Sequence, residues 1–458
     1  MSQNNHKWWQ DAIFYHIYPL GFCGALTHND FRSHPVNRLQ KVADWIPHLR
    51  ELGVTALYLG PVFESTYHGY DTVDYYQVDR RLGSNADLSV LSRSLHENDI
   101  RLVLDGVFNH VGREFFAFRD VQQKGQASEY CGWFANLRFD GQSPFGDPFT
   151  YEDWSGNFDL VKLNLSNPAV REHLFNAVHS WVEEFGIDGL RLDAADVLDE
   201  GFLKELRQFT ATLKPDFWLM GEIVGGDYRR LANPEMLHSV TNYECYKGLY
   251  SSLVDKNYFE IAWSLNRQFG PDGLYKDLIL YNFTDNHDVD RVASSLGDPA
   301  LLYPLYYLLY TMPGIPSIYY GSEWGITGRR TRSDDSALRP CPDLASMSSS
   351  APQPALPAVL RRLAELRASS PVLRGGGYTQ LLVSHDQFAF LREKDNGHVV
   401  VALNAAAEPA AMTIPLPCQA VRAVDLLNGG ETFAVQEGKL HLPEVPAHWA
   451  RVMRLRTN

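Results

Sequence analysis

The apolar positions of this chain fall into short runs, and most runs are followed by a stretch with the spacing of an amphipathic helix. This alternation predicts a parallel sheet whose strands are joined by crossover helices, and eight such units would form a barrel. Two of the expected helices are residues 168–185 and 202–212. The expected strands are 12–18, 54–60, 101–107, 189–193, 217–222, 278–284 and 315–320, with a weaker candidate at 239–243.

The spacing of acidic residues at the ends of these runs supports a barrel and locates an insertion. A barrel of about 250 residues uses roughly 31 residues for each strand and helix. Asp193 and Glu222 are 29 positions apart, and Glu222 and Asp288 are 66 apart, which fits one and two units. Asp105 precedes Asp193 by 88 positions, so an extra segment follows the third strand. We expect residues 111–158, which are rich in Gly and aromatic side chains and lack a helical period, to form a small irregular subdomain.

The composition changes after Arg339. Residues 341–357 are rich in Ser, Pro and Ala and predict a loop, and residues 358–369 predict a last helix. Short alternating segments with turn signals follow, and 388–392, 398–404 and 439–445 are candidate strands. The predicted fold is therefore α/β. A (β/α)₈ TIM barrel (1–110 and 159–371) has a small subdomain inserted after strand 3, and a C-terminal antiparallel β-sandwich (372–458) follows.

Charge and composition exclude several function classes. A formal net charge of −14 argues against nucleic acid or an anionic membrane as partner, whereas neutral sugars are compatible with it. The five cysteines form no C-x-x-C pair, which speaks against structural zinc and against a disulfide framework. The N-terminal residues lack the apolar segment of a secretory signal, so we expect a cytoplasmic protein. The apolar stretch 301–320 contains three prolines and predicts a buried helix and a strand rather than a membrane span.

Acidic residues end several of the predicted strands, and in such barrels the active residues lie at these ends. Hydrolysis of an acetal needs one carboxyl to protonate the leaving oxygen and a second to attack the anomeric carbon or activate water. A third anion favours the developing oxocarbenium charge. Asp193, Glu222 and Asp288 would supply these groups, and Arg191, two residues before Asp193, can keep that aspartate ionised. A structural ion pair would explain Asp193 alone, but not the whole set.

Four motifs, in order and with matching spacing, resemble those of the α-amylase superfamily of glycoside hydrolases. They are Asp105…Asn109-His110, Gly189-x-Arg191-x-Asp193, Glu222 in LMGEI, and Asn286-His287-Asp288. The resemblance covers essentially the whole chain. It implies that Asp193 is the nucleophile, Glu222 the general acid/base and Asp288 the acid that stabilises the transition state, with no cofactor required.

The resemblance also implies a set of sugar-binding residues around the −1 subsite. Tyr70 is expected to stack under the sugar ring, and Arg339 with Asp335 is expected to hold the non-reducing hydroxyl. Asp334 is an alternative to Asp335. The predicted substrate-binding residues are Tyr70, Asp71, His68, His110, Arg191, His287, Asp335 and Arg339.

Within the superfamily the sequence is nearest to neopullulanases, cyclomaltodextrinases and maltogenic amylases. Residues 160–164 (LVKLN) resemble their M-P-K-L-N signature. The barrel begins near Ala12, so we expect no N-terminal β-domain of the kind through which most cyclomaltodextrinase relatives dimerise, and the oligomeric state stays open. The Lys-His pair that follows the nucleophile of endo-acting α-amylases is absent. We therefore expect a retaining enzyme for small maltooligosaccharides or cyclodextrins, with a short, partly closed −1 side.

Alternatives remain for metal binding and for activity. In secreted α-amylases the residue matching Asn109 binds a structural Ca²⁺ together with acids of the inserted subdomain, but Asn109 is as readily a hydrogen-bonding residue of its loop. The acids available here are Asp140, Asp147, Glu152, Asp153 and Asp159. An α-glucosyl- or glucanotransferase would use the same catalytic residues. An inactive carbohydrate-binding scaffold is disfavoured because all three catalytic acids are present.

Overall fold

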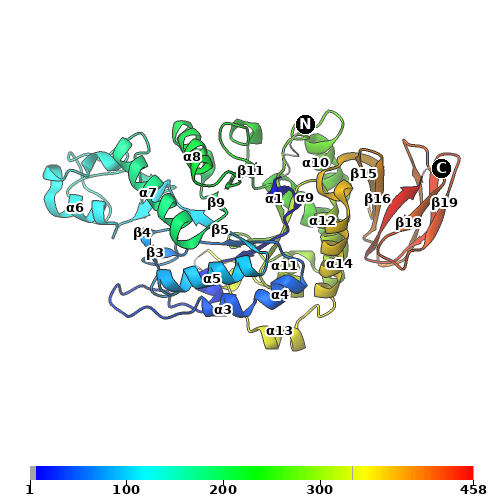
Figure 1. The fold of residues 1–458 in the computed structure, drawn as a ribbon, viewed down its shortest axis with the longest axis horizontal. Helices are drawn as coiled ribbons and strands as arrows, with labels where there is room; N and C mark the ends of the chain where they lie inside the picture. Colours follow the sequence, from blue (N-terminus) through cyan, green and yellow to red (C-terminus); the bar gives the residue numbers. More distant parts are fainter. Residues whose placement is uncertain (1–6, 333, 457–458) are drawn as a thin grey trace.

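A computed structural model describes residues 7–332 and 334–456, and its centre is a closed barrel of eight parallel strands (Figure 1). The sheet has the order β11-β10-β9-β5-β2-β1-β13-β12, and a parallel bridge between Thr241 and Tyr281 joins its two edges. The barrel strands are β1 (Phe14–Ile17), β2 (Ala56–Leu59), β5 (Arg101–Gly106), β9 (Gly189–Leu192), β10 (Trp218–Gly221), β11 (Ser239–Val240), β12 (Tyr281–Phe283) and β13 (Ile315–Tyr319). Each coincides with a predicted apolar run, so the barrel is confirmed.

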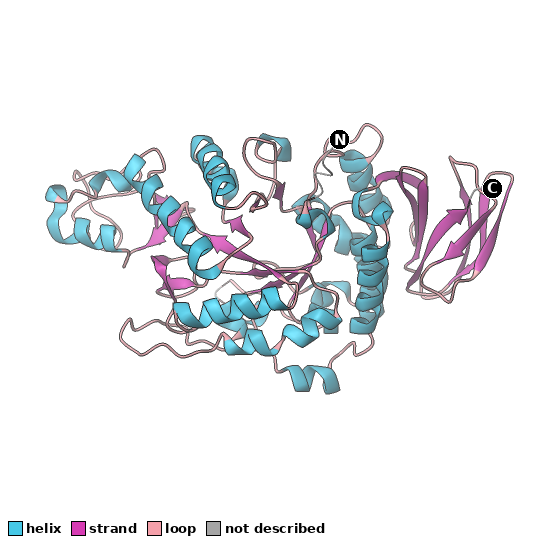
Figure 2. Ribbon diagram, viewed as in Figure 1, coloured by secondary structure: helices cyan, strands magenta, loops and turns pink. Residues whose placement is uncertain are grey.

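Helices surround the barrel, and their ends follow from local sequence (Figure 2). In α7, Asn167 accepts a hydrogen bond from the backbone of Ala169, Pro168 occupies the first turn, and Gly186 ends the helix in the left-handed conformation. The helices of the barrel are α1 (Trp8–Asp11), α2 (Pro19–Phe22), α3 (Gln40–Asp44), α4 (Ile46–Glu51), α5 (Asn85–Glu97), α7 (Pro168–Phe185), α8 (Glu200–Leu213), α9 (Tyr243–Val254), α10 (Phe259–Phe269), α11 (Val292–Leu296), α12 (Leu302–Thr311) and α14 (Leu356–Ser369). Among the described residues, no helix is both long and apolar enough to cross a membrane.

The segment after β5 leaves the barrel and forms a small sheet with the order β6-β8-β7. Its strands are β6 (His110–Gly112), β7 (Asp153–Trp154) and β8 (Asn157–Lys162), and a separate pair, β3 (Phe63–Ser65) and β4 (Thr72–Val78), follows β2. The insertion also contains the helix α6 (Phe116–Lys124), which the sequence pattern does not indicate. This helix has only nine residues, and its buried side chains lie among many other aromatic residues, so its period is hard to recognise.

The Ser-rich stretch predicted as a loop contains a helix, α13 (Leu344–Ser350), and the prediction is wrong at this point. The Asp343 carboxylate accepts a hydrogen bond from the backbone of Ser346 and caps the helix. Serine disfavours helix interiors because it competes for backbone hydrogen bonds, so the composition conceals a helix that its cap stabilises.

The C-terminal region is an antiparallel sheet of eight strands, which follows the short helix α15 (Pro371–Gly375). Its order is β14-β15-β16-β21-β18-β19-β20-β17. The strands are β14 (Gly377–Val383), β15 (Gln387–Lys394), β16 (Gly397–Asn404), β17 (Ala410–Pro415), β18 (Arg422–Asp425), β19 (Thr432–Gln436), β20 (Lys439–Val445) and β21 (Trp449–Arg456). The antiparallel sheet is confirmed, and one of its faces covers an apolar core of its own.

Candidate active site

The three predicted catalytic acids lie together at the C-terminal ends of the barrel strands. Asp193 and Glu222 follow β9 and β10 directly, and Asp288 lies in the loop after β12. All three line one pocket of about 320 Å³, together with Tyr70 and His110. The barrel topology, which directs these ends to one face, brings together residues that are far apart in the sequence.

One guanidinium group, that of Arg191, contacts three carboxylates. Its Nη1 lies 2.8 Å from Asp193 Oδ1 and 2.9 Å from Asp105 Oδ1, and its Nη2 lies 2.7 Å from Glu222 Oε2. Ala194 adopts a left-handed backbone conformation (φ 45°), and its N–H donates to Glu222 Oε2 over 3.2 Å. Such a conformation is unfavourable for alanine, and here it connects the backbone beside Asp193 to the second carboxylate.

Three carboxylates share one guanidinium group in this cluster, so negative charge is in excess. Burial, together with repulsion from Glu222 and Asp105, raises the pKa of Asp193 well above its usual value, and Arg191 opposes that rise. Burial likewise raises the pKa of Asp105. Arg191 therefore orients Asp193, as expected, but does not bring its pKa down.

Two neutral histidines lie near the catalytic acids: His110 lines the catalytic pocket, whereas His287 lines neither pocket and is stacked against Tyr70. Burial lowers the pKa of His110 to about 3 and that of His287 well below its usual value, so both are uncharged near neutral pH. His110 Nε2 lies 3.9 Å from Asp193 Oδ2 and has no hydrogen-bond partner within the described chain. His287 Nε2 lies 3.1 Å from Asp288 Oδ2. Neutral imidazole nitrogens of this kind suit the hydroxyl groups of a sugar.

Tyr70 forms the floor between these groups. Its hydroxyl donates to Asp105 Oδ2 over 3.0 Å and also contacts His287 Nε2. Its ring is stacked on that of His287, with centroids 5.3 Å apart and planes 8° apart. A flat aromatic surface at the base of the pocket is the arrangement on which a sugar ring can stack.

A second pocket of about 620 Å³ adjoins the first and shares Tyr70 and Asp288 with it. Arg339 lines the second pocket, where its Nη2 is 2.9 Å from Asp335 Oδ2 and 3.5 Å from Oδ1 of Asp288, which lines both pockets. The sequence left two aspartates as possible partners of Arg339, and Asp335 makes the contact. The Asp334 carboxylate instead accepts a hydrogen bond from the backbone of Ser336.

The loop between β3 and β4 contributes two further predicted residues, in different ways. Half-exposed His68 lines the second pocket. Asp71 is buried, and its carboxylate accepts hydrogen bonds from the backbone of Tyr67 (2.8 Å) and His68 (3.1 Å). Asp71 lines neither pocket, so the structure gives it a role in shaping the loop rather than a place among the lining residues.

Several lining residues were missed by reasoning from sequence. Trp154, from the insertion, stacks on His110 with planes 13° apart, and Tyr18, directly after β1, lies under the Arg339 guanidinium at 4.4 Å. Exposed Asp196 and Val224 line the catalytic pocket beyond Glu222. Tyr18 and Asp196 had a usable signal, because both lie at or just after the end of a predicted strand. Trp154 had no such signal, because it lies in an irregular insertion.

Some of the residues considered for Ca²⁺ have other partners within the protein. The Asn109 amide lies 3.1 Å from His110 Nδ1, which supports its alternative role as a hydrogen-bonding residue of the loop. Asp147 is paired with Arg113 and Glu152 with Lys162, so these acids already have cationic partners. Over residues 7–332 and 334–456, no group of three or more His, Cys, Asp or Glu side chains is placed to hold a metal ion.

Known proteins similar to this chain identify its family. The family model for the alpha amylase catalytic domain matches residues 16–350. A cyclomaltodextrinase from Bacillus sp. is 31% identical over 422 residues, which cover 87% of this chain and 73% of that protein. Neopullulanase 2 from Thermoactinomyces vulgaris is 31% identical over 460 residues, covering 95% of this chain and 76% of that protein.

The fold agrees with the sequence comparison. A solved cyclomaltodextrinase structure superposes with a TM-score of 0.83 at 27% identity, covering 98% of this chain and 78% of the other. The family match spans well over half of the chain and contains the residues of all four motifs. The chain therefore belongs to the α-amylase family of glycoside hydrolases.

Proposed function

We propose that this enzyme hydrolyses α-glucosidic bonds of small maltooligosaccharides or cyclodextrins with retention of anomeric configuration. The observation that carries the proposal is the contact of Asp193 and Glu222 with a single guanidinium group, that of Arg191. Two carboxylates held this way are close neighbours. Retaining glycosidases have catalytic carboxyls about 5–5.5 Å apart, whereas inverting enzymes need a wider gap for water.

In the first step Asp193 attacks the anomeric carbon of the sugar in the −1 subsite, and Glu222 protonates the departing oxygen. This forms an ester bond between the sugar and Asp193 and breaks the glycosidic bond. In the second step Glu222, now ionised, removes a proton from water, which attacks the same carbon and releases Asp193. Asp288 lines the same pocket, where its negative charge stabilises the oxocarbenium-like transition states.

Four residues around the reacting groups bind the sugar or position the carboxylates. His110 and His287 hydrogen-bond to hydroxyls of the −1 sugar, Tyr70 stacks against its ring, and Arg191 holds the two reacting carboxylates. On the donor side we expected a short, partly closed pocket. The adjoining 620 Å³ pocket is larger than the catalytic pocket, which supports further glucosyl units beyond Arg339.

Proton NMR of the first-formed product tests the stereochemistry. Retention gives the α-anomer before mutarotation, and an initial β-anomer would make Asp193 a base rather than a nucleophile. The product pattern from maltotriose, panose and a cyclodextrin then defines the substrate. We expect kcat/KM on small maltooligosaccharides to exceed that on soluble starch at least about tenfold, or about 1.4 kcal/mol.

A transferase is the second candidate, and one feature favours it. Val224 lies beside Glu222 in the catalytic pocket and is 62% exposed, so it offers an apolar surface to an acceptor sugar. If a sugar rather than water resolves the intermediate, longer oligosaccharides will accumulate at high substrate concentration. Chromatography of the products over a range of substrate concentrations distinguishes the two activities.

We propose further that the reaction requires no metal ion, because carboxylates and water suffice for every step. Dialysis against EDTA should leave both kcat and the unfolding temperature unchanged. A loss of either that Ca²⁺ restores would return Asn109 to the list of ligands.

A further inference from the structure

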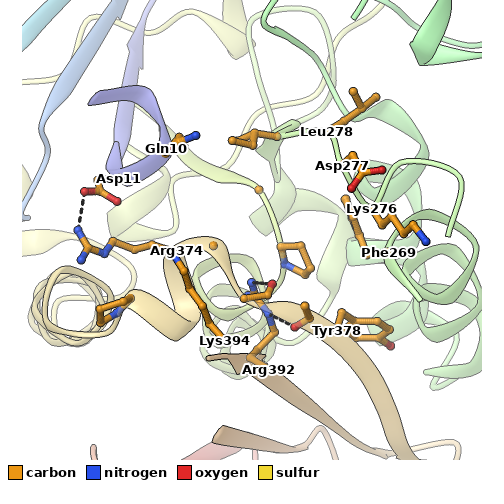
Figure 3. A pocket seen from close by; sticks show the side chains of 17 residues that line it. Gln10, Asp11, Phe269, Lys276, Asp277, Leu278, Arg374, Tyr378, Arg392 and Lys394 are labelled. Carbon is orange, nitrogen blue, oxygen red and sulfur yellow. Dashed lines mark hydrogen bonds and ion pairs between the residues drawn. The ribbon is translucent and has the colours of Figure 1, made fainter. Parts of the chain in front are cut away.

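A third pocket lies at the end of the barrel opposite the catalytic acids, where the barrel meets the C-terminal sheet (Figure 3). It has a volume of about 250 Å³. Residues just before β12 and β13, among them Leu278 and Pro313, form one part of its wall, and the turn from Arg374 to Tyr378 forms another. Since β12 and β13 begin here and end at the catalytic site, the pocket is separate from that site.

The lining carries an excess of positive charge in a protein whose net charge is −14. Figure 3 shows Arg374, Arg392 and Lys394 on one side and Lys276 with Asp277 across from them. Lys276 and Lys394 are exposed, and neither forms an ion pair in the part of the chain that the structure describes. Lys276 Nζ donates to a backbone carbonyl, that of Pro271.

Buried guanidinium groups strengthen the positive field. Arg392 is 1% exposed, and its Nε and Nη2 donate to the carbonyl oxygens of Gly377 and Gly376 over 3.0 and 2.7 Å. Behind it, Arg367 is equally buried and donates to the carbonyl of Gly314. Burial and the charge of Arg367 lower the pKa of Arg392 to about 9, which means that its cationic form is destabilised. A nearby anion would offset this cost.

Arg374 has one hydrogen-bond donor, its Nε–H, that is not paired within the described residues. One of its terminal nitrogens pairs with Asp11, but its buried Nε–H has no hydrogen-bond partner among the described residues. Besides the polar Gln10, Asp11 and Asp277, the lining includes the apolar or aromatic side chains of Phe269, Leu278 and Tyr378. The pocket therefore combines cationic donors with a surface that suits the organic part of a ligand.

We propose that this pocket binds a small phosphate monoester, with the phosphate beside Arg374 and Lys394 and the organic group toward Phe269 and Leu278, where Lys276 adds positive charge across the pocket. A phosphate monoester carries a charge of about −1.5 to −2 at pH 7 and three strong acceptor oxygens. Four cationic side chains against Asp11 and Asp277 leave an excess that matches this charge. Arginine and lysine are the side chains that proteins use to bind phosphate.

Such a ligand would join the barrel to the C-terminal sheet, because the lining comes from both. A molecule that binds only the folded protein raises its stability by mass action. We expect phosphate monoesters to raise the unfolding temperature by about 3 °C at concentrations roughly a hundred times Kd. No glucan substrate is needed for this measurement, so its outcome is independent of the proposed hydrolase activity.

The test compares the wild type with the double variant Lys276→Gln/Lys394→Gln by thermal unfolding at constant ionic strength. The probes are inorganic phosphate, glycerol 3-phosphate and glucose 6-phosphate, with glucose as the uncharged control. Because both lysines are exposed, the double variant should unfold at the wild-type temperature without ligand. The variant Lys439→Gln, which removes an exposed lysine of β20, serves as the matched control and should keep the ligand response.

The proposal predicts a rise for both esters that the double variant loses and Lys439→Gln retains. A larger rise with the esters than with inorganic phosphate supports the organic part of the site, whereas an equal rise limits it to free phosphate and overturns the monoester assignment. Absence of any rise in the wild type overturns the proposal. A rise that survives in the double variant also overturns it, since the anion would then act elsewhere.

Discussion

At the scale of single residues, the catalytic centre depends on how one cation is shared among three carboxylates. Arg191 contacts Asp105, Asp193 and Glu222, so it cannot neutralise all of them. Burial and the two neighbouring carboxylates raise the pKa of Asp193 above its usual value, so the ionised form that the first step requires depends on the contact with Arg191. The neutral state of His110 leaves this balance to the acids.

The roles of Glu222 and Asp193 can be separated with a substrate whose leaving group needs no proton. Glu222→Ala should lose several orders of magnitude on maltooligosaccharides but still form the glycosyl-enzyme from α-maltosyl fluoride. That intermediate should accumulate, because Glu222 is also the base for its hydrolysis, and added azide should release it as a glycosyl azide. Mass spectrometry should find the sugar on the peptide that contains Asp193.

Asp193→Ala is the matched control, since no covalent intermediate can form whatever the leaving group. A sugar adduct on Asp288 would refute the assignment. Equal loss of activity on both substrates in the Glu222 variant would do the same, because it would indicate a general electrostatic role instead of proton transfer.

Asp105 offers a prediction about pH. Its charge is one of the causes that raise the pKa of Asp193, and the reaction needs Asp193 ionised, so activity is lost as the pH falls through that pKa. In the wild type the acid limb of kcat/KM should lie above the usual value of 3.8. Asp105→Asn removes one repulsion and should move the limb to lower pH, besides lowering the rate. A limb that stays in place or moves upward would contradict the role given to Asp105.

At the scale of elements, the barrel was largely predictable and the loops were not. Strands such as β5 and β13 are buried over nearly their whole length, so they read as continuous apolar runs. Even the two-residue strand β11 lay within a predicted candidate. The helices α6 and α13 escaped prediction because one is short and aromatic-rich and the other is Ser-rich and stabilised by a cap. The same contrast between strands and loops holds for the site. The acids at strand ends were predicted from the sequence, whereas Trp154, which lies in the insertion, was not.

The loop after β13 brings Arg339 to the second pocket and into contact with Asp288, and the contribution of Arg339 to substrate binding can be measured. Arg339→Ala removes contacts to Asp288 and Asp335, and hydrogen bonds between charged groups contribute about 1.5–3 kcal/mol. We expect kcat/KM on maltotriose to fall about tenfold to a hundredfold. Arg332→Ala, an exposed arginine of the same loop, should have little effect. Equal effects of both substitutions, or none for Arg339, would exclude Arg339 from substrate binding.

At the scale of the whole molecule, the C-terminal sheet is less independent than its sequence indicates. Alternate residues of β15 face opposite ways: Phe388 and Phe390 belong to the same core cluster as the barrel, whereas Ala389 and Leu391 belong to the core of the sheet itself. The alternating pattern predicts a two-sided strand but cannot identify what covers each face. The contact with the barrel joins residues far apart in the sequence and could be found only from the structure.

This shared core predicts that the barrel and the C-terminal sheet unfold together. Separating them would expose apolar residues of β15 and β16 along with the helices that cover them, so partial unfolding is unfavourable. Differential scanning calorimetry should show one transition.

Phe388→Ala, at the junction, costs about 3–5 kcal/mol by the usual range for such truncations and should lower the temperature of that whole transition. Leu440→Ala, in the core of the sheet alone, should lower the same transition and not create a second one. Two transitions in the wild type, or a Leu440 variant in which one part of the molecule melts early while enzymatic activity persists, would mean that the sheet is a separate folding unit attached to the barrel.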